Sequence, residues 1–159
     1  MDDELTPELI TSKNNARIKN IRKLRSRQER DRTDTLLVDG IRQVSEAIQS
    51  GAEIEELLVA PDLLRSRFAL DLVAVEQERG TATRHLAPDV FQSISERDHP
   101  QGLAAVVRQR WTTLDAIQVN PSNLWVALES VADPGNLGTI LRTSDAVGAA
   151  GVILLGQST

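Results

Sequence analysis

One segment near the end of this 159-residue sequence combines residue types that suit chemistry on a phosphate-bearing ligand. It reads Asp133-Pro-Gly-Asn136-Leu-Gly138-Thr-Ile-Leu-Arg142. Gly138 and Arg142 are four residues apart, so on a helix they lie one turn apart on the same face. The glycine lacks the side chain that would screen the arginine, which leaves bare backbone beside the guanidinium. We therefore take Arg142 as a candidate catalytic or phosphate-binding residue.

The turn residues of this segment predict its local structure. Asp133 to Asn136 fits a type II turn, with proline at the second place and glycine at the third, and Asn136 is then placed to cap a helix. The same spacing also fits a plain surface helix in which Arg142 and Asp145 form an i,i+3 ion pair. Spacing alone favours neither interpretation. The sequence contains neither the G-x-G-x-x-G dinucleotide fingerprint nor a Walker-type G-K-[ST] loop.

A second segment, from Thr11 to Arg32, is strongly basic. Nine lysines and arginines against two acids give it a charge of +7, so the other 137 residues of a chain with net charge −5 carry −12. Such a run is ordinarily a solvated helix face, but the scarcity of acids here favours contact with a polyanion. The candidate nucleic-acid contacts are Lys13, Asn15, Arg17, Lys19, Arg22, Lys23, Arg25 and Arg27, together with the backbone at Gly138.

Composition excludes several other kinds of site. The chain has no cysteine, which rules out disulfides, zinc-thiolate sites and cysteine nucleophiles, and we expect no metal site. Two Trp, two Phe and no Tyr argue against an aromatic platform for stacking bases. His85 and His99 lie outside the motif, and we interpret them as surface or hinge residues. The acidic start is no signal peptide and no apolar run has the length of a membrane span, which predicts a cytoplasmic protein.

Hydrophobic periodicity and turn signals predict strands that alternate with helices. Ser12 or Asn14 is expected to cap the first helix, whose apolar positions are Ile18, Ile21 and Leu24. The expected strands are 36–38, 57–60, 81–86, 103–108, 124–128 and 152–155. The expected later helices are 41–49, 63–75, 88–95 and 136–147. This order predicts an α/β fold with a sheet that is at least partly parallel.

The same pattern divides the chain into four parts. We predict an acidic tail over 1–10, a first domain over 11–110, a linker over 111–122 and the start of a second domain over 123–159. The last part holds a single β–α–β unit, which cannot bury both faces of a sheet. We therefore expect it to be truncated or to be completed by a partner.

Four stretches, in order along the chain, resemble the SpoU/TrmH type of RNA ribose 2′-O-methyltransferases of the SPOUT superfamily. Residues 133–142 with 148–155 are similar to the first conserved motif of that family. Residues 12–24 resemble the opening of its N-terminal RNA-binding domain, and 37–47 resemble the first strand and helix of that domain. Residues 98–107 resemble the hinge before its last strand.

This resemblance implies a ribosomal-protein-like α/β/α RNA-binding domain followed by the start of an α/β-knot methyltransferase domain. The implied enzyme transfers a methyl group from S-adenosylmethionine to a ribose 2′-hydroxyl of rRNA or tRNA, and it is a cytoplasmic homodimer. Arg142 matches the catalytic arginine of the family and Asn136 matches the asparagine of its first motif. Glu129 falls where the family often has an acidic residue, which is a weaker match. Arg142 would act either as the base or as a clamp on phosphate and alkoxide.

The sequence departs from the family in one respect. The second and third motifs, which form the knot and enclose the cofactor, do not occur in these 159 residues. We therefore assign no cofactor-binding residue within this chain, and we expect the chain alone to be catalytically inactive. The competing interpretations are a non-catalytic RNA-binding module and, less favoured, a protein-interaction domain.

Overall fold

The computed structural model describes residues 8–118 and 120–156, and the chain divides into two compact units, the first ending at Arg110 and the second beginning at Trp111. Each unit is described by itself. Unit 1 contains β1 (Leu9–Ile10), α1 (Ala16–Lys23), α2 (Arg27–Thr33), β2 (Thr35–Asp39), α3 (Ile41–Gln49), β3 (Ile54–Val59), α4 (Arg67–Glu78), β4 (Ala82–Leu86), α5 (Pro88–Ile94) and β5 (Leu103–Arg108). Unit 2 contains a 3₁₀ turn η1 (Leu114–Ala116), β6 (Trp125–Glu129), α6 (Pro134–Ala146) and β7 (Gly151–Leu155).

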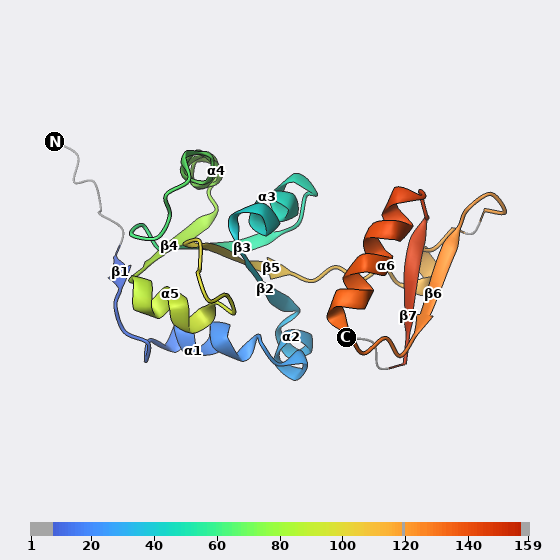
Figure 1. Ribbon diagram of the computed structural model, residues 1–159, viewed down its shortest axis with the longest axis horizontal. Coiled ribbons are helices and arrows are strands. Elements are labelled where there is room, and N and C mark those ends of the chain that lie inside the picture. Colours follow the sequence, from blue (N-terminus) through green and yellow to red (C-terminus); the bar gives the residue numbers. More distant parts are fainter. Residues whose placement is uncertain (1–7, 119, 157–159) are drawn as a thin grey trace. The chain divides into compact units, whose positions relative to one another are not determined.

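Unit 1 is a three-layer α/β/α domain, as predicted. Its five strands lie in the order β1-β4-β3-β5-β2, and β5 runs antiparallel to both of its neighbours. Helices α1 and α5 lie on one face of the sheet and α3 and α4 on the other (Figure 1). Neighbouring strand residues alternate between the two cores: Leu58 packs with α1 and α5, and Leu57 packs with α3 and α4.

The basic segment folds as two short helices rather than one. Asn15 caps α1 by accepting hydrogen bonds from the backbone N–H groups of Arg17 and Ile18, so the predicted cap at Ser12 or Asn14 is wrong. The helix ends after Lys23, and Ser26 then caps α2 by accepting from the N–H of Glu29. Serine is a good N-cap residue, so Ser26 marks the start of a second helix, a signal that the run of charges concealed.

The first strand lies inside the segment predicted to be an acidic tail. Leu9 and Ile10 form β1, which pairs in parallel with β4 at His85 and Leu86. The N–H of Ala87 also donates to the carbonyl of Ile10 at 2.9 Å. The tail prediction is therefore wrong for these two residues, whose pattern is too short to show periodicity. Residues 1–7 lie outside the described part of the chain.

Unit 2 is a single parallel β–α–β unit. Strands β6 and β7 pair from Trp125 with Gly151 to Glu129 with Leu155. Helix α6 begins at Pro134, with Asp133 as its cap: Oδ1 of Asp133 accepts from the N–H of Asn136 at 2.6 Å. The prediction of a type II turn, followed by a helix with Asn136 as its cap, is therefore wrong. Proline suits the first position of a helix, where its missing N–H costs nothing, so Asp-Pro opens the helix earlier than predicted.

Candidate functional site

The carboxyl ends of the two strands in unit 2 are joined directly. The N–H of Ser130, just after β6, donates to the carbonyl of Leu155 in β7 at 3.0 Å. Gly156 has a φ of +64°, and a Cβ there would lie 2.7 Å from Oγ of Ser130. Helix α6 therefore starts from a closely packed strand end, which is where open α/β sheets bind ligands.

Arg142 is exposed on α6 and folds back towards Gly138. One of its terminal nitrogens, Nη2, donates to Oγ1 of Thr139 at 3.1 Å, and the Thr139 hydroxyl donates in turn to the carbonyl of Gly135 at 3.0 Å. A Cβ on Gly138 would lie only 3.3 Å from Nη1 of Arg142. The glycine therefore leaves the space in which the guanidinium lies, in agreement with the spacing argument.

No ion pair holds Arg142 among the residues that the structure describes, and the alternative pair with Asp145 is not formed. Most of its N–H donors, and its charge, are free to meet a ligand. Thr139 was not selected from the sequence, although it directs this side chain. A threonine three positions before an arginine on one helix face is the signal that would have identified it.

The other motif residues do not gather around Arg142. Asn136 is exposed, and it is six positions before Arg142, which separates the two by about 120° around the helix axis. Its backbone N–H is used by the Asp133 cap. Glu129 is exposed at the end of β6. The structure therefore brings Gly138, Thr139 and Arg142 together and leaves Asn136 on another side of the helix.

In unit 1, most arginines of the basic segment are bound within the fold. Arg17 contacts the buried carboxylate of Glu56 through Nε and Nη2, each at 2.5 Å. Arg22 donates to the carbonyl of Lys13 at 2.6 Å. Arg25 donates to the carbonyls of Ser93 and Ser95 and lies 3.6 Å from Glu96. The guanidiniums of Arg17 and Arg25 thus join α1 and the residues that follow it to the sheet and to α5.

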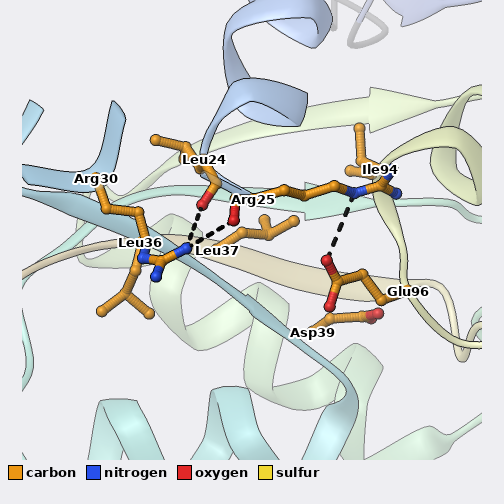
Figure 2. Close-up of a pocket in the computed structure, with 8 residues that line it drawn as sticks. All are labelled: Leu24, Arg25, Arg30, Leu36, Leu37, Asp39, Ile94 and Glu96. Atoms are coloured by element: carbon orange, nitrogen blue, oxygen red, sulfur yellow. Dashed lines mark hydrogen bonds and ion pairs between the residues drawn. The ribbon is translucent and has the colours of Figure 1, made fainter. Parts of the chain in front are cut away.

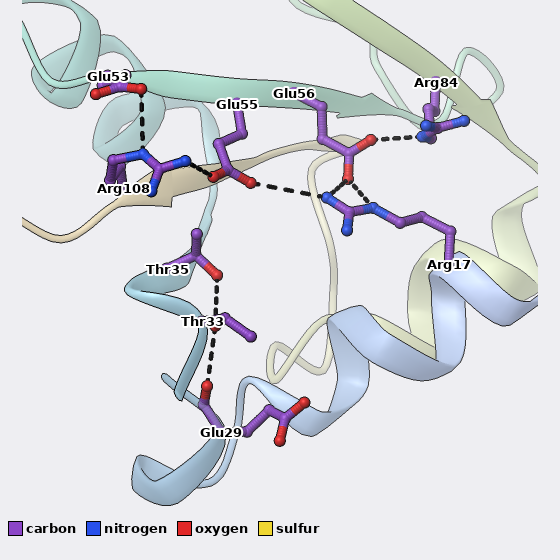
Figure 3. Close-up of polar contacts among 9 residues, drawn as sticks. All are labelled: Arg17, Glu29, Thr33, Thr35, Glu53, Glu55, Glu56, Arg84 and Arg108. Carbon is purple, nitrogen blue, oxygen red and sulfur yellow. Dashed lines mark hydrogen bonds and ion pairs between the residues drawn. The ribbon is translucent and has the colours of Figure 1, made fainter. Parts of the chain in front are cut away.

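Figure 3 shows the polar network around Glu56. Its two carboxylate oxygens face Arg17 from α1 and Arg84 from β4, and its side chain is 3% exposed. Glu55, the neighbouring residue, contacts Arg108 of β5 at 2.6 Å. The network therefore fixes α1 over the sheet by contacts with residues far away in the sequence.

The lysines of α1 are the available cations of the segment. Lys19 and Lys23 are exposed four positions apart on one helix face, and no ion pair forms with either in the described structure. Lys13 lies 3.5 Å from Asp89, with both side chains more than half exposed. Asn15 is occupied as the helix cap, and Arg27 lies 3.6 Å from Asp31.

At the end of the basic segment, the charge of Arg32 is neutralised by Glu29. Two hydrogen bonds from Arg32 reach Glu29, and these bonds, followed by the charge of Arg32, hold the pKa of the Glu29 carboxyl below its ordinary value. Within residues 8–118 and 120–156, no acid or histidine cluster could hold a metal ion. In the same ranges, no helix has the length and apolar character needed to cross a bilayer.

Comparisons with known proteins agree on one family. The family model described as the MRM3-like substrate binding domain matches residues 15–105 of this chain. The structure is similar to that of an rRNA methyltransferase from Sinorhizobium meliloti, with 35% identity and a TM-score of 0.81 over 96% of this chain and 56% of the other. That protein has also been solved with AdoMet bound. The SpoU methyltransferase AviRb from Streptomyces viridochromogenes, in complex with the cofactor AdoMet, is 32% identical with a TM-score of 0.75 over 91% of this chain and 53% of the other.

A curated relative agrees with these structures. The 23S rRNA (guanosine(2553)-2′-O)-methyltransferase RlmP of Bacillus subtilis is 33% identical over 145 residues, which are 91% of this chain and 53% of that protein. The chain spans about half the length of the curated relatives it matches.

Proposed function

Because the chain belongs to the family of the MRM3-like substrate binding domain and resembles SpoU methyltransferases through both of its units, we propose that the protein acts in ribose 2′-O-methylation of ribosomal RNA. Unit 1 holds the RNA, and unit 2 presents Arg142 to the ribose that is methylated. The methyl donor is S-adenosylmethionine. We also propose that the protein is a cytoplasmic homodimer, as the resemblance implies.

The observation that carries the proposal is the state of Arg142. Its guanidinium is exposed, held by Thr139 above Gly138, and without a carboxylate partner in the described structure. Arginine is a poor base, since its guanidinium keeps its proton at physiological pH, but its fork of N–H donors suits phosphate and alkoxide oxygens. We assign Arg142 to clamp the phosphate next to the target ribose and to stabilise the negative charge that forms on the 2′-oxygen.

S-adenosylmethionine supplies the methyl group when it is bound. The described residues of unit 2 do not by themselves fit this group. No residue of β6 or β7 is fully buried, and α6, the one α-helix described there, can cover only one face of their sheet. A closed cavity for an adenosyl group is not formed by two strands and one helix, so we derive no step through the cofactor.

RNA binding by unit 1 rests on the lysines in and beside α1. Lys13 lies just ahead of this short helix and Lys19 and Lys23 project from it, while its apolar side is buried in the core. Because each neutralised phosphate releases counterions, their contribution is measurable as salt dependence. Replacing all three by Ala should reduce the slope of log Kd against log salt by about 0.7–0.9 for each phosphate that is no longer neutralised. Arg32→Ala is the matched control, since Arg32 is already paired with Glu29.

The catalytic assignment is tested by single-turnover methylation of rRNA with the protein at its natural length. Arg142→Ala should lower the rate by about 10²-fold or more, and Arg142→Lys should also be impaired because it loses the two-pronged geometry. Asp145→Ala on the same helix should retain the wild-type rate, since it makes no pair with Arg142. Wild-type turnover in Arg142→Ala would refute the assignment and favour a non-catalytic RNA-binding module.

A further inference from the structure

A cavity of about 350 Å³ opens in unit 1 between the end of α1, helix α2, strand β2 and the end of α5 (Figure 2). This volume is at the lower end of the range for small-molecule sites. Its apolar lining comes from Leu24, Leu36, Leu37 and Ile94, and its polar lining from two arginines and two acids. None of the lysines of α1 belongs to this lining, so the cavity is distinct from the basic helix face.

One end of the cavity carries a positive charge that the protein does not neutralise. Arg30 is half-buried, and its Nη1 donates to the carbonyls of Leu24 at 3.1 Å and Arg25 at 2.9 Å. No acid pairs with Arg30 in the part of the chain that the structure describes, and its other N–H groups have no partner there. Two carbonyls therefore fix this guanidinium in place. A fixed guanidinium with unused donors is suited to a phosphate.

The other end of the cavity carries hydrogen-bond acceptors. In Figure 2, Glu96 and Asp39 lie at the opposite end from Arg30. The Glu96 side chain is 74% exposed and contacts Arg25 at a distance of 3.6 Å, which leaves its carboxylate open to a further donor. Oδ2 of Asp39 accepts from the Ser95 hydroxyl at 2.6 Å, while its buried Oδ1 accepts no hydrogen bond in the described structure.

From this arrangement we infer that the cavity receives one unpaired nucleotide of the RNA, a deepening that rests on the proposed function. Its phosphate meets Arg30, the face of its base lies on the partly exposed Leu37, and the amino edge of the base points to Glu96. Adenine, cytosine and guanine carry an exocyclic amino group that can donate to a carboxylate, whereas uracil carries none. The cavity therefore favours an amino-bearing nucleotide over uridine, and it adds base selectivity to the non-selective attraction of the lysines.

The inference is tested on the 159-residue chain, labelled with ¹⁵N, by titration with four heptaribonucleotides. These are UUUGUUU, UUUAUUU, UUUCUUU and UUUUUUU. At least one amino-bearing oligonucleotide should bind about tenfold more tightly than UUUUUUU, the discrimination expected of one good base contact. It should shift the amide signals of Leu37 and Ile94, which UUUUUUU should leave nearly unmoved.

Two variants test the two ends of the cavity independently. Glu96→Ala should abolish the preference for the amino-bearing oligonucleotide, and the exposure of Glu96 makes this change safe for folding. Arg30→Gln should weaken binding of the preferred oligonucleotide by several-fold, while Arg32→Gln, the control on the same helix, should change neither affinity nor preference. A preference that survives Glu96→Ala would overturn the inference, as would inorganic phosphate producing the same shifts as the oligonucleotides.

The two proposals fail in different ways. Equal affinity for all four oligonucleotides, with shifts confined to Lys19 and Lys23, would overturn the nucleotide cavity and leave RNA binding by α1 intact. No salt-dependent binding of any oligonucleotide would overturn the RNA role of unit 1 itself.

Discussion

The two units differ in how completely they enclose their sheets. Unit 1 has helices on both faces and two separate cores, with Ile18, Leu57 and Phe91 completely buried. Among the described residues of unit 2, Leu137 is the one buried apolar side chain, at 9% exposure, and every residue of β6 and β7 is at least partly exposed. Unit 1 is thus well packed, whereas Arg142, the candidate catalytic residue, lies on the less closely packed unit 2.

The arginines show the same contrast. In unit 1, Arg17, Arg22 and Arg25 are held by carboxylates and carbonyls of the fold. In unit 2, Arg142 has only a threonine hydroxyl as its partner among the described residues. Arginine is therefore structural at positions 17, 22 and 25 and available for chemistry at position 142, and what distinguishes the two cases is the set of partners that the fold provides.

The largest expected effect comes from the core of unit 1. Phe91→Ala should lower the free energy of unfolding by about 3–5 kcal/mol, because a fully buried aromatic side chain is replaced by a cavity. Circular dichroism during denaturation follows this loss. Both tryptophans, Trp111 and Trp125, belong to unit 2, so tryptophan fluorescence reports on that unit alone. An equal shift of the fluorescence midpoint would show that the two units unfold together and would remove the contrast between them.

The next effect concerns the buried carboxylate of unit 1. Glu56→Gln removes the charge that faces Arg17 and Arg84 and should cost about 2 kcal/mol. The cost is below that of a fully buried pair because the two arginines are 38% and 45% exposed. Glu53→Gln is the control, since the exposed pair of Glu53 with Arg108 contributes little. Equal unfolding midpoints for these two variants would contradict a stabilising role of the Glu56 network.

A third variant separates stability from activity in unit 2. Gly138→Ala should stabilise α6 by about 0.5–1 kcal/mol, because alanine favours helix more than glycine. Its new methyl group would lie 3.3 Å from Nη1 of Arg142 and should displace the guanidinium. Fluorescence-monitored denaturation should therefore show a gain while single-turnover methylation falls by about tenfold, as a misplaced catalytic group does. Unchanged turnover would mean that the position of Arg142 does not depend on Gly138.

The smallest effect is the pH dependence of α2. Hydrogen bonds from Arg32 lower the pKa of Glu29, so the folded state holds the carboxylate form more strongly than the unfolded state does. The resulting stabilisation is present above the ordinary pKa of glutamate and is lost as the pH falls through the lowered value. Arg32→Gln should therefore be slightly less stable than wild type at neutral pH and equal to it in acid. A difference that stays constant with pH would exclude this origin.

The sequence predicted much of the fold because the residues that start and end its helices are easily recognised. Helix α3 begins and ends where predicted, since Gly40 and Gly51 both lie in the positive-φ region beside it. The break between α1 and α2 was missed because a serine inside a run of charges does not disturb the apolar spacing. The type II turn at Asp133 was wrong because an Asp-Pro-Gly-Asn sequence suits a helix start as well as a turn.

The candidate site was predictable only where it is local. Gly138 and Arg142 lie on one helix, so spacing alone placed them together. The engagement of Arg17 and Arg25 could not be predicted, because the partners Glu56 and Ser95 lie 39 and 70 residues away. Only the folded sheet shows that these arginines hold the fold together, while Lys19 and Lys23 stay exposed and form no ion pair with the described residues.

The two-residue strand β1 has a practical consequence for handling the protein. β1 covers the outer backbone of β4, which would otherwise be an open edge of the sheet. An open edge offers unpaired N–H and carbonyl groups to another molecule and promotes aggregation. Shortened versions of the chain that start at α1 would therefore lose solubility, and purification tags are better joined ahead of Leu9 than used to replace it.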